Sequence, residues 1–257
     1  MGRTLEGKAA VVTGASRGIG AEIAAELARE GARVMLAARS AEALRERAVA
    51  IGEQAVTYVA DLREPAAPAA LAAAAMARFG RIDIVVANAG ATKRGDFLAL
   101  TDEDWQDGFA LKFFAHMRLI RAAWPHLKEA RGSVVIISGI GGKTPGAEFT
   151  IGGSVNAALL ALTKALADRA VPDRIRVNTI NPGDIRTDRL ARRIQVATER
   201  FGVDATEAER RMVAEDRVLR FGEPSDIAGL VSFIVGPRGG FLQGSIIDMD
   251  GGKTKTT

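Results

Sequence analysis

The stretch that decides the fold is TGASRGIG, residues 13–20, which follows the apolar run AAVV at residues 9–12. Its glycines have separate physical tasks: Gly14 permits a tight turn, Gly18 lets the backbone approach a pyrophosphate, and Gly20 lets a helix pack closely on a strand. A helix that begins directly after such a turn offers free N–H groups to an anion. The chain is therefore expected to begin with a strand, a dinucleotide-binding turn and a helix.

The composition allows a large α/β domain and excludes several kinds of site. The chain has 257 residues, of which 47% are hydrophobic and 26% are charged, so it can bury a core. It has no cysteine, which excludes disulfides, thiolate metal ligands and a cysteine nucleophile, and its two histidines are too few for an all-histidine metal centre. The 35 basic and 31 acidic residues are spread along the chain, which is typical of an ordinary solvated surface. We expect no bound metal and no nucleic-acid partner.

Short β-branched runs alternate with helical stretches along most of the chain. The expected strands are residues 9–13, 33–38, 55–60, 82–87, 133–138, 175–180 and 245–248. The expected helices are residues 21–29, 41–49, 66–79, 102–127, 153–168 and 225–235. These repeated strand–helix–strand units predict a Rossmann-type three-layer α/β/α sandwich, in which helices cover both faces of a seven-stranded parallel sheet.

Residues 186–220 interrupt this alternation. The segment contains nine arginines interleaved with seven acidic residues. We expect it to be a charged helical insertion within a single domain of residues 1–257. The sequence leaves open whether the insertion is a lid over a site or a pair of surface helices joined by salt bridges.

The chain carries no feature that directs it to a membrane. Its first residues have no apolar signal core, and Glu6 breaks a myristoylation pattern. No apolar stretch approaches the roughly 18 residues of a membrane span. We expect a cytoplasmic protein without a membrane partner.

The TGxxxGxG spacing and several later motifs resemble the short-chain dehydrogenase/reductase family, classical subgroup. The matching motifs are Asp61-Leu62, Asn88-Ala89-Gly90, Asn181-Pro182-Gly183 with Ile185 and Thr187, and Asp250-Gly251-Gly252. The resemblance implies strand order 3-2-1-4-5-6-7 and a homotetramer that pairs through helices around residues 102–127 and 152–169. The predicted cofactor-binding residues are Gly14, Ser16, Arg17, Gly18, Ile19, Gly20, Arg39, Asp61, Leu62, Asn88, Ala89, Gly90, Pro182, Gly183, Ile185 and Thr187.

The end of the second expected strand bears on which nucleotide is bound. An acidic residue at this place accepts the ribose 2′-OH of NAD, but the sequence has Ala38 followed by Arg39. With Arg17 in the glycine loop, two guanidiniums can clamp a 2′-phosphate through charge-assisted hydrogen bonds. We therefore expect NADP(H) rather than NAD(H).

All four positions at which the family carries its catalytic set are changed. The resemblance places Lys112, Gly139, Gly152 and Asn156 where the family has asparagine, serine, tyrosine and lysine. The single tyrosine of the chain, Tyr58, lies in the third expected strand, near the adenine side of the pocket. The family's usual tyrosine mechanism is therefore excluded.

Lys112, Ser138 and Asn156 are the candidate catalytic residues. Burial and a positive nicotinamide ring would lower the pKa of Lys112 into the range of an acid or base at neutral pH. Ser138 could polarise a carbonyl, although its register points it under the sheet, and Asn156 could hold a substrate by its amide. Each also has a structural alternative, such as a lysine that snorkels or pairs with a carboxylate. Weaker candidates are His116, Lys143, Glu148 and Asp184.

Three functions remain open at this point. The first is an NADP(H)-dependent oxidoreductase that acts on a carbonyl or alcohol substrate. The second is a non-catalytic NADP(H)-binding pseudoenzyme or sensor, and the third is a non-redox lyase, dehydratase or isomerase, since a fold alone does not fix the chemistry. The arginines of residues 186–220 suggest an anionic substrate, such as a carboxylate or a CoA ester.

Overall fold

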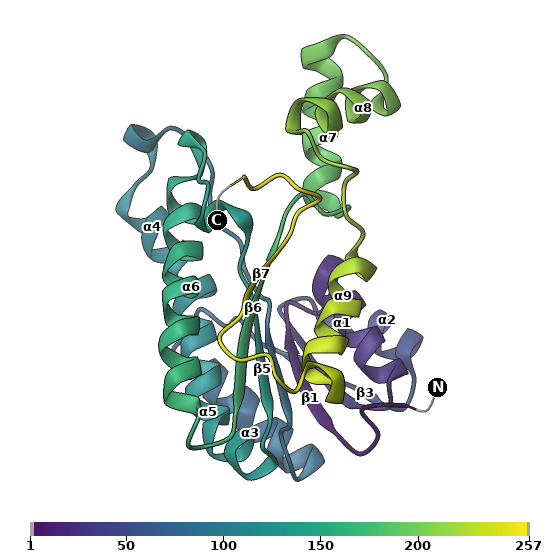
Figure 1. Ribbon diagram of the computed structural model, residues 1–257, viewed down its shortest axis with the longest axis vertical. Coiled ribbons are helices and arrows are strands. Elements are labelled where there is room, and N and C mark those ends of the chain that lie inside the picture. The colour runs from purple at the N-terminus through teal and green to yellow at the C-terminus, as the bar shows by residue number, and fades with distance from the viewer. Residues whose placement is uncertain (1–2, 256–257) are drawn as a thin grey trace.

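A seven-stranded parallel sheet in the order β3-β2-β1-β4-β5-β6-β7 forms the centre of the computed structural model, which describes residues 3–255 (Figure 1). The strands are β1 (Ala9–Thr13), β2 (Arg33–Ala38), β3 (Ala55–Val59), β4 (Ile84–Ala87), β5 (Ser133–Ile137), β6 (Arg176–Pro182) and β7 (Ile246–Met249). The helices are α1 (Gly18–Arg29), α2 (Ala41–Ile51), α3 (Ala67–Phe79), α4 (Asp102–Phe109), α5 (Ala115–Ala130), α6 (Thr150–Ala170), α7 (Asp188–Phe201), α8 (Ala205–Asp216) and α9 (Pro224–Val235). The predicted Rossmann-type fold and strand order are confirmed.

The strand order places a ligand-binding edge in the middle of the sheet. β1 lies between β2 and β4, so the chain first adds strands on one side of β1 and then crosses to the other side. Open α/β sheets bind ligands at the carboxyl ends of the strands beside such a switch. The loops that follow β1, β4 and β5 meet at this edge.

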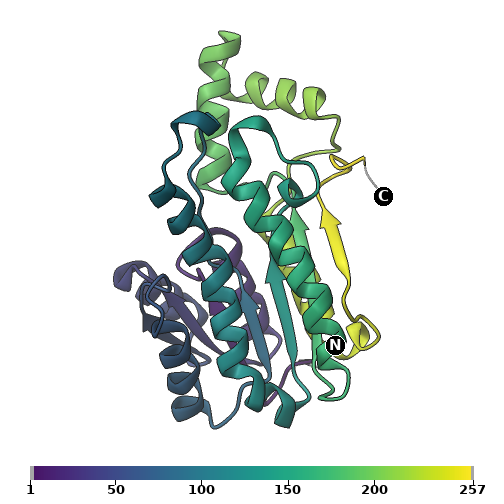
Figure 2. The same cartoon turned by 90° about the vertical axis from the view of Figure 1, so that its left-hand side faces the viewer.

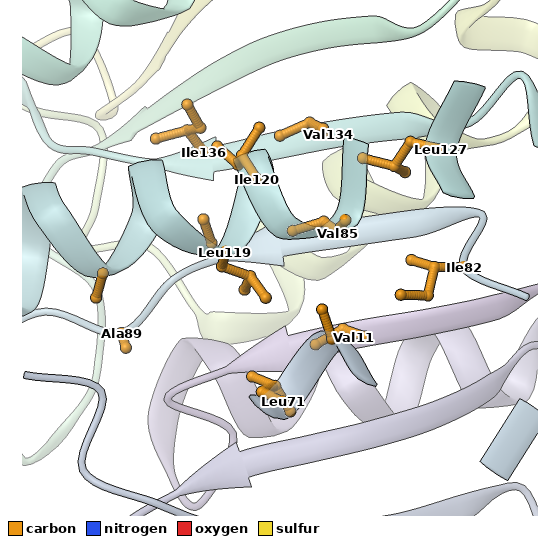
Figure 3. Close-up of a cluster of buried hydrophobic side chains, with 14 of the residues drawn as sticks. Val11, Leu71, Ile82, Val85, Ala89, Leu119, Ile120, Leu127, Val134 and Ile136 are labelled. Carbon is orange, nitrogen blue, oxygen red and sulfur yellow. The ribbon is translucent and has the colours of Figure 1, made fainter. Parts of the chain in front are cut away.

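Helices cover both faces of the sheet and divide the core into two apolar layers. α3, α5 and α6 cover one face, where they lie side by side (Figure 2). Val11, Val85 and Val134 of the sheet pack there against Leu119 and Ile120 of α5 (Figure 3). α1 and α9 cover the opposite face. The five inner strands, β2, β1, β4, β5 and β6, are buried on both faces, which explains their continuous apolar sequences.

The helix expected over residues 102–127 is divided in the structure. α4 and α5 are joined by a π-helical turn, Ala110–Phe114, in which Lys112 lies. α4 begins with a capping box, because the Thr101 side chain accepts from the Asp104 amide and the Asp104 side chain accepts from the Thr101 amide. π-helical turns are frequent at functional sites, because the wider turn displaces one side chain from the regular helical positions.

α7 and α8 occupy residues 188–216 and project beyond the carboxyl edge of the sheet (Figure 1). They enclose a small apolar cluster of their own, which includes Leu190, Met212 and Phe221. The chain enters and leaves the projection side by side, where Ile185 and Gly222 form a parallel bridge. The segment is therefore anchored at a narrow base above the sheet edge.

One helical stretch is longer and more apolar than the sequence reading allowed. Residues 147–170, which end with α6, reach a mean hydropathy of 1.3 over an 18-residue window, enough by length and composition to cross a membrane. The expectation that no apolar stretch approaches the length of a membrane span is therefore wrong. However, Val155 and Leu159 are fully buried in the core and α6 packs on β6. A buried core helix can have the same length and hydropathy as a membrane span.

Candidate functional site

A cleft of about 1300 Å³ runs across the carboxyl edge of the sheet, from the end of β2 to the base of α7. It is lined by every residue predicted to bind the cofactor and by the three candidate catalytic residues, Lys112, Ser138 and Asn156. These residues come from segments far apart in the sequence. The parallel sheet brings them together because the carboxyl ends of its strands lie on one edge.

The glycine loop forms the floor of the cleft beside β1. Gly14 has a φ of +67°, and a Cβ at this position would lie 2.8 Å from the Asn88 side-chain nitrogen. That nitrogen donates to the carbonyl of Thr13 at 2.8 Å, so the loops after β1 and β4 are held together. A Cβ on Gly18 would lie 3.1 Å from Thr187 Cγ2. Only glycines allow the backbone to run this close to the opposite wall.

The start of α1 has the properties of an anion site. Arg17 is the N-cap residue, and no side chain caps the first-turn amides of the helix. These amides therefore remain available, and the helix dipole favours negative charge at this end. The glycine loop and the uncapped helix together fit a pyrophosphate.

The two arginines that the sequence assigned to a 2′-phosphate, Arg39 and Arg17, have different partners in the structure. Arg39 follows β2, is exposed, and places Nη1 3.7 Å from Asp61 Oδ2. Arg17 instead pairs with Asp188 at the start of α7, at 3.1 Å. Arg39 is therefore at the predicted place, whereas the guanidinium of Arg17 faces α7.

Lys112 reaches the floor of the cleft from the π-helical turn. Its Nζ donates to Asn156 Oδ1 at 2.5 Å and to the Ser138 carbonyl at 3.0 Å. Its stem passes Gly90, where a Cβ would lie 2.9 Å from Lys112 Cδ. Burial, with a smaller contribution from the charge of Arg189, lowers the pKa of Lys112 to about 7. The ammonium has three protons, so one remains for a ligand in the cleft after these two acceptors are satisfied.

The other candidate residues support this arrangement without a free reactive group. The Ser138 hydroxyl donates to the Asn156 carbonyl at 3.2 Å, and the residue is buried although it lines the cleft. Gly139 lies so close to α6 that a Cβ would be 3.0 Å from Asn156 Nδ2. Ser138 therefore contacts the second turn of α6, and Asn156 orients Lys112.

Several weaker candidates have structural roles. His116 is buried, donates from Nε2 to the Ala89 carbonyl at 2.7 Å, and does not line the cleft. Lys143 pairs with Asp248 at 2.7 Å. Asp184 lines the cleft but is paired with Arg193 and with Lys253, the latter at 2.8 Å.

Tyr58 lies on β3 and does not line the cleft; it lines a separate groove between α2 and α3. Ala60, two residues later, does line the cleft, so the tyrosine lies on β3 just before the chain reaches the cleft. It is remote from Lys112, which the loops after β4 and β5 surround.

Sequence reasoning missed the wall opposite Lys112. Arg94 stacks its guanidinium over the Phe149 ring, 4.2 Å from the ring centroid, and both residues line the cleft. The Phe149 ring covers Gly152, where a Cβ would lie 2.1 Å from two ring carbons. Arg189 of α7 donates to the Gly90 carbonyl at 3.5 Å. The sequence signal for these residues was weak, because each lies in or beside a loop whose partner is distant in the chain.

Comparisons with known proteins agree with this geometry. The family model described as Enoyl-(Acyl carrier protein) reductase matches residues 14–254. An uncharacterized oxidoreductase of Mycobacterium tuberculosis (strain CDC 1551 / Oshkosh) is 37% identical over 257 residues, which cover 97% of this chain and 93% of the relative.

Two solved structures resemble the chain over nearly its whole length. L-Sorbose reductase from Gluconobacter frateurii, complexed with NADPH and L-sorbose, has a TM-score of 0.94 and 32% identity, with 100% of both chains covered. A short chain oxidoreductase from Pseudomonas aeruginosa PAO1 that contains an atypical catalytic center has a TM-score of 0.91 and 28% identity, with 98% of this chain and 99% of that chain covered.

Proposed function

The chain belongs to the short-chain dehydrogenase/reductase family of oxidoreductases, and from this premise we propose that it interconverts a carbonyl and an alcohol with NADP(H), using Lys112 as the proton donor and acceptor. The observation that carries the proposal is the position of Lys112. Its Nζ lies in the cofactor-sized cleft, between Asn156 Oδ1 and the Ser138 carbonyl. Its pKa is lowered to about 7 by burial and by Arg189, so both protonation states are populated at neutral pH.

The cleft residues fit a nicotinamide dinucleotide. The uncapped start of α1 and the glycine loop would hold the pyrophosphate, and Arg39 would hold a 2′-phosphate at the end of β2. When bound, NADPH supplies the hydride for the carbonyl carbon. The protein residues supply placement and the proton.

Lys112 would give its third ammonium proton to the carbonyl oxygen in the reduction and would remove the hydroxyl proton in the oxidation. Asn156 acts as a positioning residue, since its Oδ1 holds Nζ at 2.5 Å. Ser138 positions the α6 backbone and does not touch the substrate, because its hydroxyl is committed to the Asn156 carbonyl. Gly139 and Gly152 contribute no functional group.

The first test is to follow NADPH consumption at 340 nm with a panel of ketones, aldehydes and alcohols, beside a fluorescence titration of NADPH binding. We expect turnover that Lys112→Met lowers by about 10²- to 10⁴-fold, the usual cost of losing a general acid, with the NADPH dissociation constant nearly unchanged. NADPH binding without any turnover would instead identify a non-catalytic cofactor-binding protein. The absence of NADPH binding at millimolar cofactor would overturn both.

We also propose that α7 and α8 form a lid over the cleft. The base of α7 contacts the cleft at two places. Arg189 donates to the Gly90 carbonyl at one, and Asp184 pairs with Lys253 at the other. Lys253 joins Asp184 to Asp216 at the end of α8, at 2.8 and 2.7 Å. Replacing Lys253 with Met should raise the rate at which α7 and α8 are proteolysed. Added NADPH should lower this rate less in the variant than in the unchanged protein.

The homotetramer that the resemblance implies is also a proposal. α4, α5 and α6 lie on one face of the sheet, with Phe114 39% exposed in the single chain. A helix face of this kind would be covered by a second copy. Light scattering after gel filtration measures the assembly, and a monomer of 27.1 kDa would contradict the proposal.

A further inference from the structure

The cleft carries more positive charge than the residues around it neutralise. The carboxylates that line it are Asp61, Asp184 and Asp188. Each has a basic partner: Asp61 is near Arg39 and Arg63, Asp184 binds Arg193 and Lys253, and Asp188 binds Arg17. The arginines that line the cleft and have no carboxylate within 4.0 Å, in the part of the chain that the structure describes, are Arg94, Arg189 and Arg192.

Two of these arginines, Arg94 and Arg189, line the part of the cleft that also contains Lys112 and Asn156. Arg189 donates to the Gly90 carbonyl, and Gly90 is also the residue against which the Lys112 stem packs. Arg94 stacks on the Phe149 ring, which covers Gly152 one helical turn before Asn156. Arg189 therefore lies beside the stem of Lys112, Arg94 lies over the ring that covers Gly152, and both contacts leave most of the guanidinium N–H groups free.

The cofactor accounts for other charges in the cleft. The start of α1 and Arg39 lie at the pyrophosphate and adenine ends, whereas Arg94 follows β4 on the Lys112 side. The charges of Arg193 and Arg189 repel that of Arg94, and neither Glu148 nor Asp184 forms an ion pair with it. An anion between them would relieve this repulsion and accept charge-assisted hydrogen bonds.

We propose that the substrate is a carbonyl compound with a carboxylate, held by Arg94 and Arg189 while its carbonyl oxygen faces Lys112. This rests on the proposed function and names its substrate class. Each guanidinium would contribute through N–H···O bonds that a neutral ester cannot replace. A charge-assisted pair of this kind corresponds to roughly tenfold or more in binding.

The test compares C4 to C10 oxo acids with their methyl esters, because each pair shares a carbon skeleton and a carbonyl and differs in charge. Binding to the free protein and to the NADPH complex is measured by calorimetry, and turnover at 340 nm. We expect at least one acid to bind roughly tenfold more tightly than its ester. Arg94→Gln and Arg189→Gln should each lower the affinity for the acid about tenfold and leave that for the ester unchanged. Arg78→Gln, an exposed arginine of α3 outside the cleft, is the matched control.

The outcomes separate the two proposals. If acids bind with this preference but no NADPH is oxidised, the proposed reaction is wrong and the carboxylate site stands. If no acid binds better than its ester, or if the two variants leave the preference unchanged, the carboxylate site is wrong whatever the turnover. If Arg189→Gln weakens NADPH binding as much as acid binding, Arg189 serves the cofactor and the two-arginine site is overturned.

Discussion

The ring of Phe149 occupies the space in which a side chain at residue 152 would begin. A Cβ on Gly152 would lie 2.1 Å from Cε2 and from Cζ of Phe149, far inside van der Waals contact. The ring is held there by the guanidinium of Arg94, 4.2 Å from its centroid. At residue 152, where the sequence resemblance places the family's tyrosine, the Phe149 ring and Arg94 therefore fill the space beside the backbone.

This contact predicts strong coupling between the two residues. Gly152→Ala should lower the free energy of unfolding by about 1–3 kcal/mol, because the new methyl group overpacks against the ring. Phe149→Ala in the same chain should remove the clash, so the double variant should be more stable than the sum of the single changes predicts. Urea unfolding of the four proteins gives the coupling energy.

The matched control is Gly229→Ala on α9. A Cβ there would meet nothing within 4 Å, so this change should stabilise the helix by about 0.5–1 kcal/mol. Additive effects of Gly152→Ala and Phe149→Ala on the free energy of unfolding would show that the Phe149 ring moves freely and is not fixed against residue 152.

The lowered pKa of Lys112 predicts the direction of the pH dependence. Protonated Lys112 donates in the reduction, so kcat/KM for carbonyl reduction should fall as the pH rises through about 7, and the oxidation should rise over the same range. The charge of Arg189 contributes to the low pKa, so Arg189→Gln should move the midpoint to higher pH. Initial rates at 340 nm between pH 5.5 and 9 measure both profiles. A reduction rate that does not change across this range would exclude Lys112 as the donor.

The fold and much of the cleft could be predicted because they depend on local patterns. The glycine spacing and the apolar runs determine the strand ends, and the parallel sheet then brings Lys112 and Asn156 to one edge. The direction of a side chain was harder to predict, since Arg17 turns to Asp188 through a contact that no spacing encodes.

Other features depend on contacts across the fold. The π-helical turn that carries Lys112 has no pattern distinct from a regular helix, so the sequence predicted one continuous helix. The stacking of Arg94 on Phe149 joins two loops that lie more than 50 residues apart. Such contacts can be found only in the folded structure, because no sequence pattern near either residue predicts the other as its partner.

His116 predicts a loss of stability in acid. Burial lowers its pKa to about 4, whereas the unfolded chain binds this proton near pH 6.5. Between these pH values the unfolded state therefore binds a proton that the folded state does not bind. The free energy of unfolding should fall by on the order of 3 kcal/mol as the pH drops from about 6.5 to about 4. Urea unfolding across this range should show a smaller fall for His116→Gln than for the wild type.

His126→Gln is the control for this measurement, because His126 is half-buried near the end of α5 and the substitution removes the same residue type. We expect it to retain the acid dependence of the wild type. Equal acid dependence in His116→Gln and the wild type would show that another group is responsible.

Arg39 predicts the choice of cofactor. Arg39 directly follows Ala38, the last residue of β2. Its Nη1 lies 3.7 Å from Oδ2 of Asp61, in the loop after β3. Arg39→Ser should therefore weaken NADPH binding about tenfold or more and leave NADH binding nearly unchanged, because only the 2′-phosphate needs this charge. Fluorescence titration of both cofactors measures the ratio. Arg17→Ser should change the ratio less, since Arg17 is engaged with Asp188. If instead both cofactors lose affinity equally in Arg39→Ser, the arginine acts on the shared part of the dinucleotide and the preference for NADP(H) has another source.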